Sequence, residues 1–184
     1  MNTTWSALLL GALLPLGAAA QQNVLIVIAD DLGVDQLRVY DAGDDAPSTP
    51  TINALASQGV VFRNAWANPI CSPSRAALQT GRHGFRTGVG WLIDSDLPAL
   101  PLAEITLPEL LDRGTDSGWE HALIGKWHLG NGNVGGNLNP NLQGYDHFSG
   151  TLGNFTSNGQ NWSYTNWLKV VDGAESISNV YATT

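Results

Sequence analysis

The sequence has a single cysteine, Cys71, among its 184 residues. A chain with one cysteine cannot form an internal disulfide bond. If it is exported, its cysteine must be a free thiol, a link to another chain or a modified residue. Free cysteines are most often small, buried hydrophobic residues. The polar neighbours of Cys71 in the sequence favour a chemical role instead.

Basic residues are also scarce. The sequence has 8 Lys and Arg against 16 Asp and Glu, which gives a formal net charge of −8. This balance argues against a nucleic-acid binder, because such proteins usually carry a basic face. It also argues against general attraction of polyanions, so an anionic substrate would have to be held by local groups.

Long hydrophobic runs are absent beyond the N-terminus. Residues 5–16 are almost wholly apolar, and residues 18–20 (AAA) offer a cleavage site. This run is too short and too interrupted by Gly and Pro for a comfortable membrane span. We predict a signal peptide at residues 1–20 and a mature domain at residues 21–184, with a membrane anchor or a mispredicted start as alternatives. The protein is expected to be exported to the periplasm, the cell exterior or the lysosome, without stable membrane association.

The order of apolar and turn-forming segments is typical of an α/β protein with a mainly parallel sheet flanked by helices. The predicted strands are residues 24–28, buried on both faces, then 60–62, 122–124 and a late edge strand at 170–171. The predicted helices are residues 49–58, 73–79 and 106–111. Beyond Gly130 the chain is rich in Gly and Asn, and we expect loops there.

Two polar pairs follow predicted strands, where ligands of α/β sheets bind. Asp30 and Asp31 are adjacent carboxylates that repel each other unless a cation or a donor compensates them. A hard divalent metal would do so, and a solvated turn with a capping Asp is the alternative. Lys126 and His128 flank Trp127, so alternation would place both polar side chains on one side. Lysine can hold an anion and histidine can move a proton, although such a pair on a surface loop often has no function.

Cys71 precedes a predicted helix, with Arg75 one turn further on. The helix N-terminus and the guanidinium group create a positive field that would favour a thiolate or bind an anion. The alternative is a capped helix that carries a buried cysteine.

Two segments carry a resemblance to a known family. Residues 71–82 (CSPSRAALQTGR) resemble the sulfatase signature, Cys-x-Pro-Ser-Arg followed by Leu-x-Thr-Gly-Arg, and residues 125–130 (GKWHLG) resemble the family's second signature. Residues 23–31 are similar to its opening metal-binding strand, and residues 49–62 to its linker helix and strand. The resemblance covers roughly residues 23–150 and implies an alkaline-phosphatase-like sheet of which this chain holds the N-terminal part.

The resemblance implies a formylglycine-dependent hydrolysis of sulfate esters. In this family a separate formylglycine-generating enzyme oxidises the signature cysteine to an aldehyde, which hydrates to a diol. One hydroxyl attacks sulfur and the alcohol leaves; the second then loses its proton and expels sulfate. By the same resemblance, Asp30, Asp31 and modified Cys71 would bind Ca²⁺. Arg75 would hold the diol, Lys126 would bridge the diol and a sulfate oxygen, and His128 would assist proton loss.

Several alternatives stay open. Members of the family are much longer than this chain, so the remaining calcium ligands and the acid for the leaving group are expected outside it. A phosphate or phosphonate ester hydrolase of the same superfamily, or a truncated non-catalytic domain, would also fit. The substrate could be a sulfated sugar or an aryl sulfate. Tryptophans such as Trp91 and Trp162 could stack on sugar rings, although core packing is their more common role.

Overall fold

The computed structural model describes residues 23–115, 118–155 and 163–182. The predicted signal peptide and Trp162 lie outside these ranges. Among the described residues, no helix has the length and hydrophobicity needed to cross a bilayer.

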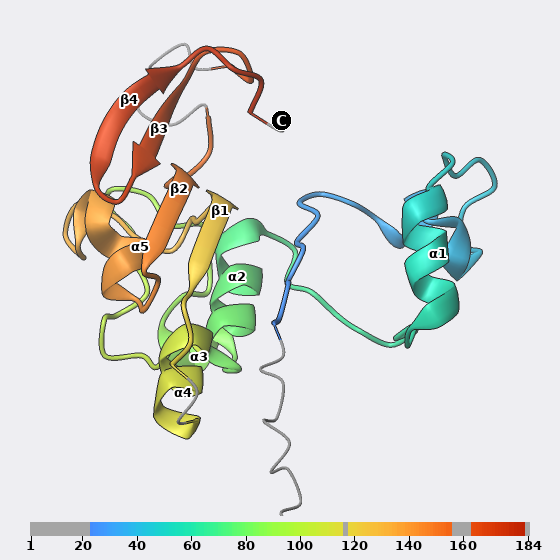
Figure 1. The fold of residues 1–184 in the computed structure, drawn as a ribbon, viewed down its shortest axis with the longest axis horizontal. Coiled ribbons are helices and arrows are strands. Elements are labelled where there is room, and N and C mark those ends of the chain that lie inside the picture. Colours follow the sequence, from blue (N-terminus) through green and yellow to red (C-terminus); the bar gives the residue numbers. More distant parts are fainter. Residues whose placement is uncertain (1–22, 116–117, 156–162, 183–184) are drawn as a thin grey trace, which may run out of the picture.

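A four-stranded sheet forms one side of the molecule (Figure 1). Its strands, in spatial as well as sequence order, are β1 (Ala122–Lys126), β2 (His147–Thr151), β3 (Trp167–Val171) and β4 (Ala174–Ser178). The strands β1 and β2 are parallel, whereas β3 is antiparallel to both β2 and β4. The predicted α/β class is confirmed, and this part of the sheet is mixed because β3 and β4 form a hairpin. Its turn residues, Asp172 and Gly173, both have positive φ, as such two-residue hairpin turns require.

In this part of the molecule, three helices precede the sheet in the sequence, and a fourth lies between β1 and β2. They are α2 (Cys71–Thr80), α3 (Gly84–Thr87), α4 (Leu107–Gly114) and α5 (Asn139–Leu142), with a short 3₁₀ helix at Gly136–Leu138. The predicted capping box of α4 is confirmed: the Glu109 carboxylate accepts a hydrogen bond of 2.9 Å from the backbone N–H of Thr106. The expectation of loops after Gly130 is wrong in part, because Gly- and Asn-rich turns there separate short regular elements. The late edge strand predicted at residues 170–171 is part of β3, which lies inside the sheet, and β4 is the edge strand.

The hydrophobic core lies between α2, the sheet and the loops that join them. Its buried members are Ala76, Val89, Ile93, Ala99, Leu100, Trp127, Leu129, Phe148 and Val170. Trp127 directly follows β1, and its indole N–H donates to the side-chain oxygen of Asn139 in α5. This packing fixes the backbone at the carboxyl end of β1, between Lys126 and His128.

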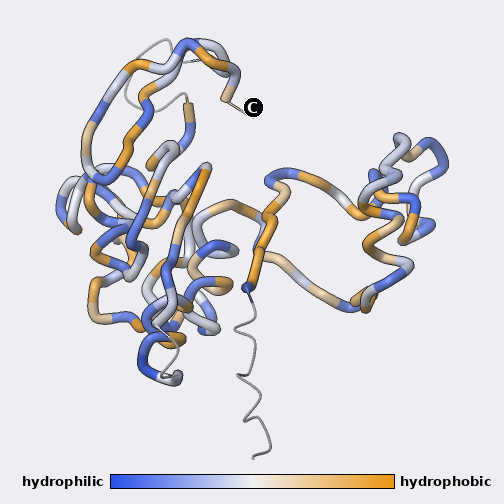
Figure 2. Tube along the Cα trace, viewed as in Figure 1, coloured by the Kyte–Doolittle hydropathy of each residue, from blue (hydrophilic) through white to orange (hydrophobic). Residues whose placement is uncertain are grey.

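The N-terminal region, residues 23–62, lies largely outside this core (Figure 1). The helix α1 (Pro50–Gln58) forms where predicted, between Thr49 and Gly59, but none of its residues is buried. The predicted strands at residues 24–28 and 60–62 are wrong: both segments lack strand pairing and are mostly exposed. Figure 2 shows the first of them as a continuous hydrophobic stretch. Its apolar pattern suits a sheet interior, and the described residues supply no neighbouring strand to pair with it.

Candidate active site

Cys71 is the first residue of α2. The helix was expected to begin at Pro73, but the chain enters it two residues earlier. Ser74 stabilises this entry, because its hydroxyl accepts a 3.0 Å hydrogen bond from the N–H of Asn68 and lies 3.1 Å from the carbonyl oxygen of Ile70. No side-chain cap occupies the helix N-terminus. The first backbone N–H groups of α2 are therefore available to an anion beside Cys71.

The Cys71 sulfur lies among charged groups from two other segments. Lys126, the last residue of β1, places its Nζ 3.1 Å from Cys71 Sγ and 2.8 Å from Asp30 Oδ2. The sulfur lies 3.5 Å from Asp30 Oδ1. Asp30 and Lys126 lie 41 and 55 positions from Cys71 in the sequence, and both side chains contact its sulfur. This convergence is expected if the three residues belong to one site.

Arg75 joins the same group from one turn along α2. Its side chain is 11% exposed, and one guanidinium nitrogen lies 3.3 Å from Asp30 Oδ2 while another donates to the backbone carbonyl of Lys126. Burial of the Asp30 carboxyl group acts to raise its pKa. The hydrogen bond and charge of Lys126, with the charge of Arg75, outweigh this effect and hold the pKa below its ordinary value of 3.8. Asp30 is therefore a carboxylate near neutral pH.

His128 lies just beyond β1 and is 4% exposed. The pairing of β1 with β2 continues to this point, since the His128 N–H donates to the Leu152 carbonyl at 3.0 Å. Burial lowers the pKa of His128 from 6.5 to about 4, and the positive charge of Lys126 adds to this effect. The imidazole is consequently neutral at pH 7. Its buried Nδ1 has no hydrogen-bond partner among the described residues.

Glycines allow the close backbone approach beside Lys126. Gly125 and Gly150 face each other across β1 and β2, and Gly125 has a φ of 115°. A Cβ atom at Gly150 would lie 1.7 Å from the Gly125 carbonyl oxygen. A side chain at Gly150 would therefore push the two strands apart next to Lys126.

Three of the predicted site residues have the spacing of a partial metal site. One ligand atom from each of Asp30, Asp31 and Cys71 lies within 4.8 Å of the other two. Ca²⁺ takes oxygen ligands at about 2.3–2.6 Å, so two of its ligands can be roughly 5 Å apart. The spacing fits Ca²⁺ if the Cys71 sulfur is regarded as occupying the place of an oxygen on a modified side chain. Lys126 and Arg75 already neutralise part of the Asp30 charge, and Ca²⁺ usually takes 6–8 ligands, so further ligands would be required.

The sequence patterns missed a loop that borders the site, residues 88–98. Ile93 in this loop donates its N–H to the hydroxyl of Ser72 at 3.1 Å. Trp91 is 64% exposed, so core packing is the wrong expectation for it. The only sequence signal was Trp91 itself, named as one of several tryptophans that could stack on a ring, and a lone tryptophan does not identify a site.

Comparison with known proteins gives consistent results. A protein-family model described as Sulfatase matches residues 22–182. Steryl-sulfatase from Homo sapiens is 42% identical over 121 residues, covering 61% of this chain and 20% of that protein. Arylsulfatase A from Homo sapiens is 39% identical over 147 residues, covering 78% of this chain and 28% of that protein. A solved structure described as Ps i-CgsB in complex with k-i-k-neocarrahexaose matches with a TM-score of 0.65 and 26% identity, over 85% of this chain and 37% of that one. The chain thus spans about a quarter of the length of these curated relatives.

Proposed function

This chain belongs to the sulfatase family, and from that premise we propose that it carries the nucleophile-bearing part of an active site that hydrolyses sulfate esters. The observation that carries the proposal is the contact of Cys71 Sγ with Lys126 Nζ at 3.1 Å, beside the Asp30 carboxylate. Lys126, from the second sulfatase signature, is thereby held against Cys71, from the first.

The positive groups around Cys71 suit a sulfate ester, which carries one negative charge. Lys126 Nζ and the uncapped N-terminus of α2 both adjoin Cys71, and the Arg75 guanidinium lies beside Asp30. Together they can bind the non-bridging sulfate oxygens and stabilise the charge that develops as the ester bond breaks. Because the overall charge is −8, this local arrangement supplies the attraction for the anion.

Two additions would complete the chemistry at residue 71. Oxidation of Cys71 to formylglycine would supply an oxygen nucleophile for sulfur, and Ca²⁺ held by Asp30, Asp31 and residue 71 would supply further positive charge. The imidazole of His128 is neutral at pH 7 and would accept the proton of the second hydroxyl. Asp30 is held at the site by its ion pairs with Lys126 and Arg75.

The remaining features follow from the same proposal. Residues 1–20 would direct export, and residues 21–184 would form the N-terminal part of the catalytic domain. The substrate would be the sulfate ester of a sterol or aryl alcohol, as the names of the two relatives indicate, or of a sugar, as the oligosaccharide bound in the similar solved structure suggests. A formylglycine-generating enzyme would be the partner during maturation, and we propose no nucleic-acid partner.

Turnover of an aryl sulfate by the full-length gene product, co-expressed with a formylglycine-generating enzyme, tests this function. Cys71→Ala should abolish turnover, and Lys126→Ala should lower kcat by about 100-fold or more, as removal of a charge-stabilising group typically does. Undiminished turnover in the Cys71→Ala protein would contradict the nucleophile assignment. Faster hydrolysis of the matching aryl phosphonate by the unmutated protein would assign the site to phosphonate esters instead.

A further inference from the structure

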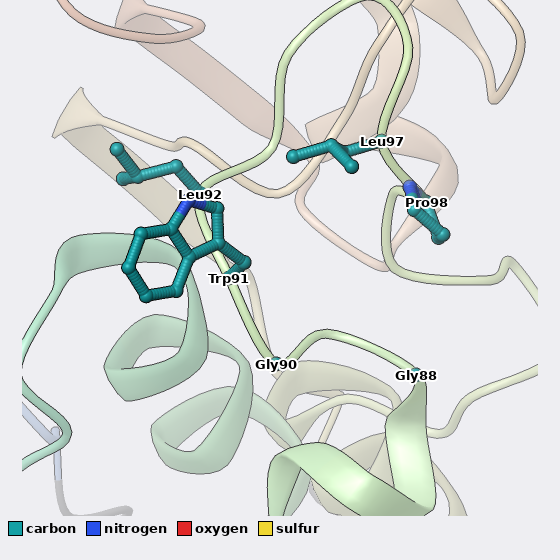
Figure 3. Close-up of a pocket in the computed structure, with 6 residues that line it drawn as sticks. All are labelled: Gly88, Gly90, Trp91, Leu92, Leu97 and Pro98. Atoms are coloured by element: carbon teal, nitrogen blue, oxygen red, sulfur yellow. The ribbon is translucent and has the colours of Figure 1, made fainter.

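The loop of residues 88–98 lines a cavity of about 250 Å³, here called the Trp91 pocket. Its lining residues are Gly88, Gly90, Trp91, Leu92, Leu97 and Pro98. Figure 3 shows the side chains of Trp91 and Leu92 close together, with Leu97 reaching towards them from the other arm of the loop. The pocket is lined by apolar side chains and glycine backbone, without a charged side chain.

Hydrogen bonds fix this loop to both halves of the candidate active site. On the α2 side, Ile93 donates its N–H to Ser72, the residue next to Cys71. On the β1 side, the side chain of Asn131 donates to the carbonyl oxygens of Asp94 and Leu97 at 3.2 and 3.0 Å. The position of the pocket relative to Cys71 is therefore set by direct contacts, and Trp91 lies only two residues from Ile93.

Trp91 presents a large apolar surface that the described part of the chain does not use. Its side chain is 64% exposed. Aromatic side chains that stack on a bound ring stabilise the complex beyond the area they bury. An exposed tryptophan beside Leu92 and Leu97 thus offers one wide face and two flanking apolar contacts.

The chemistry of the lining distinguishes between possible rings. A sugar ring would bring hydroxyl groups against leucine and proline side chains, and each hydroxyl that lost water without a new partner would weaken binding. An aryl or steroid-like hydrocarbon ring has no such cost and gains from removal of apolar surface from water. The lining therefore favours a hydrocarbon ring.

We propose that the Trp91 pocket receives an apolar ring of the alcohol that leaves the sulfate ester, and that Trp91 determines specificity for it. This inference rests on the proposed function, because it takes Cys71 as the position of the sulfate group. The pocket would hold the ring while Lys126 and the N-terminus of α2 hold the sulfate. Trp91 would act in binding and would take no part in bond cleavage.

Kinetics of variants of the full-length, matured gene product test this assignment. Trp91→Ala should lower kcat/KM for 2-naphthyl sulfate about tenfold, mainly through KM, because the stacking face and roughly 1.4 kcal/mol of binding are lost. Trp91→Phe should stay within about threefold of the unmutated protein, since a flat ring remains. Phe85→Ala is the matched control, since Phe85 is an exposed aromatic of α3 that does not line the pocket, and it should leave kcat/KM unchanged. Turnover of galactose 6-sulfate, if present, should be the same in all four proteins.

Binding of the product alcohol 2-naphthol, measured by calorimetry, gives a readout that needs no turnover. Trp91→Ala should weaken this binding about tenfold, and Phe85→Ala should not change it. Equal 2-naphthol affinity in the unmutated and Trp91→Ala proteins, or no binding by either, would overturn the pocket assignment even if sulfate esters are hydrolysed. An equal loss of galactose 6-sulfate turnover in Trp91→Ala would overturn the preference for a hydrocarbon ring. Failure to hydrolyse any sulfate ester, with 2-naphthol still bound through Trp91, would contradict the proposed function alone.

Discussion

The core region, formed around α2, β1 and β2, and the N-terminal region, residues 23–62, both contribute to the candidate active site but are held in different ways. In the core region, Trp127 and Leu129 are almost completely buried, and Lys126 and His128 are adjacent to them in the sequence. In the N-terminal region, Leu25 and Val27 are more than 80% exposed, and Asp30 reaches the site through ion pairs with Lys126 and Arg75. Packing therefore positions the cations, and electrostatic attraction positions the carboxylate.

The largest expected difference between the two regions is in stability. Trp127→Ala should lower the free energy of unfolding by about 3–5 kcal/mol, because it leaves a cavity in the core and removes the donor to Asn139. Leu25→Ala, in the exposed segment, should change it by less than about 0.5 kcal/mol. Urea denaturation followed by circular dichroism measures both. Losses of similar size would mean that residue 25 is as well packed as residue 127.

The next largest effect is a pH dependence that originates in the core region. The folded chain binds a proton at His128 only near pH 4, whereas the unfolded chain binds it near pH 6.5. The contribution of His128 to stability should thus be constant above about pH 6.5 and fall by roughly 3 kcal/mol as the pH drops towards 4.

His128→Asn should flatten this dependence. Asparagine does not titrate, and it tolerates the positive φ of 61° at this position. Urea midpoints at pH 7 and pH 4.5 compare the two proteins. An equally steep loss in His128→Asn would assign the acid sensitivity to other groups.

Helix caps provide a smaller, matched comparison. Thr106 of the core region is fully buried, and its hydroxyl donates to the Gln143 carbonyl at 2.6 Å while its backbone is capped by Glu109. Thr49 begins α1 in the N-terminal region without a side-chain capping bond. Thr106→Ala should cost about 1–2 kcal/mol and Thr49→Ala only a few tenths. Thermal unfolding of both variants compares the two losses of stability. A larger loss in Thr49→Ala than in Thr106→Ala would mean that α1 depends on its cap more than α4 does.

The smallest effect on stability should come from the ion pairs that join the two regions. Asp30→Asn should cost less than about 1 kcal/mol, because partly exposed ion pairs contribute little. It should nevertheless speed cleavage within residues 23–31 by thermolysin, since the segment loses its attachment to Lys126 and Arg75. Asp44→Asn is the control, as an exposed carboxylate without an ion pair among the described residues. Equal cleavage rates in the two variants would show that Asp30 does not hold the segment.

The sequence predicted most of the core region and the composition of the candidate site. Local signals were sufficient for α1, α2 and α4. Pro50 in α1 and the Thr106–Glu109 pair in α4 act within a single turn of helix, whereas Thr49 forms no side-chain capping bond. The resemblance brought together Asp30, Cys71, Arg75 and Lys126, which the structure places in contact.

The remaining features depend on contacts between distant segments. The apolar run at residues 24–28 suits the interior of a sheet, but neighbouring strands would have to come from other segments, and the described residues supply none. The hairpin of β3 and β4 follows a Gly- and Asn-rich stretch that suggested loops, because short strands there carry weak patterns. The Trp91 pocket depends on two hydrogen bonds of a loop without periodicity: the Ile93 N–H donates to the Ser72 hydroxyl, and the Asn131 side chain donates to the Asp94 carbonyl. No local pattern reports such bonds.

The central claim is that Cys71 is the nucleophile precursor of a sulfatase site, and its most direct test is the mass of the tryptic peptide Asn64–Arg75. Produced with a formylglycine-generating enzyme, this peptide should be about 18 Da lighter than the unmodified sequence, from exchange of the thiol for an aldehyde. Cys71→Ala, treated in the same way, should give only its own unmodified mass. An intact thiol at Cys71, in a host that converts a known sulfatase in parallel, would contradict the claim.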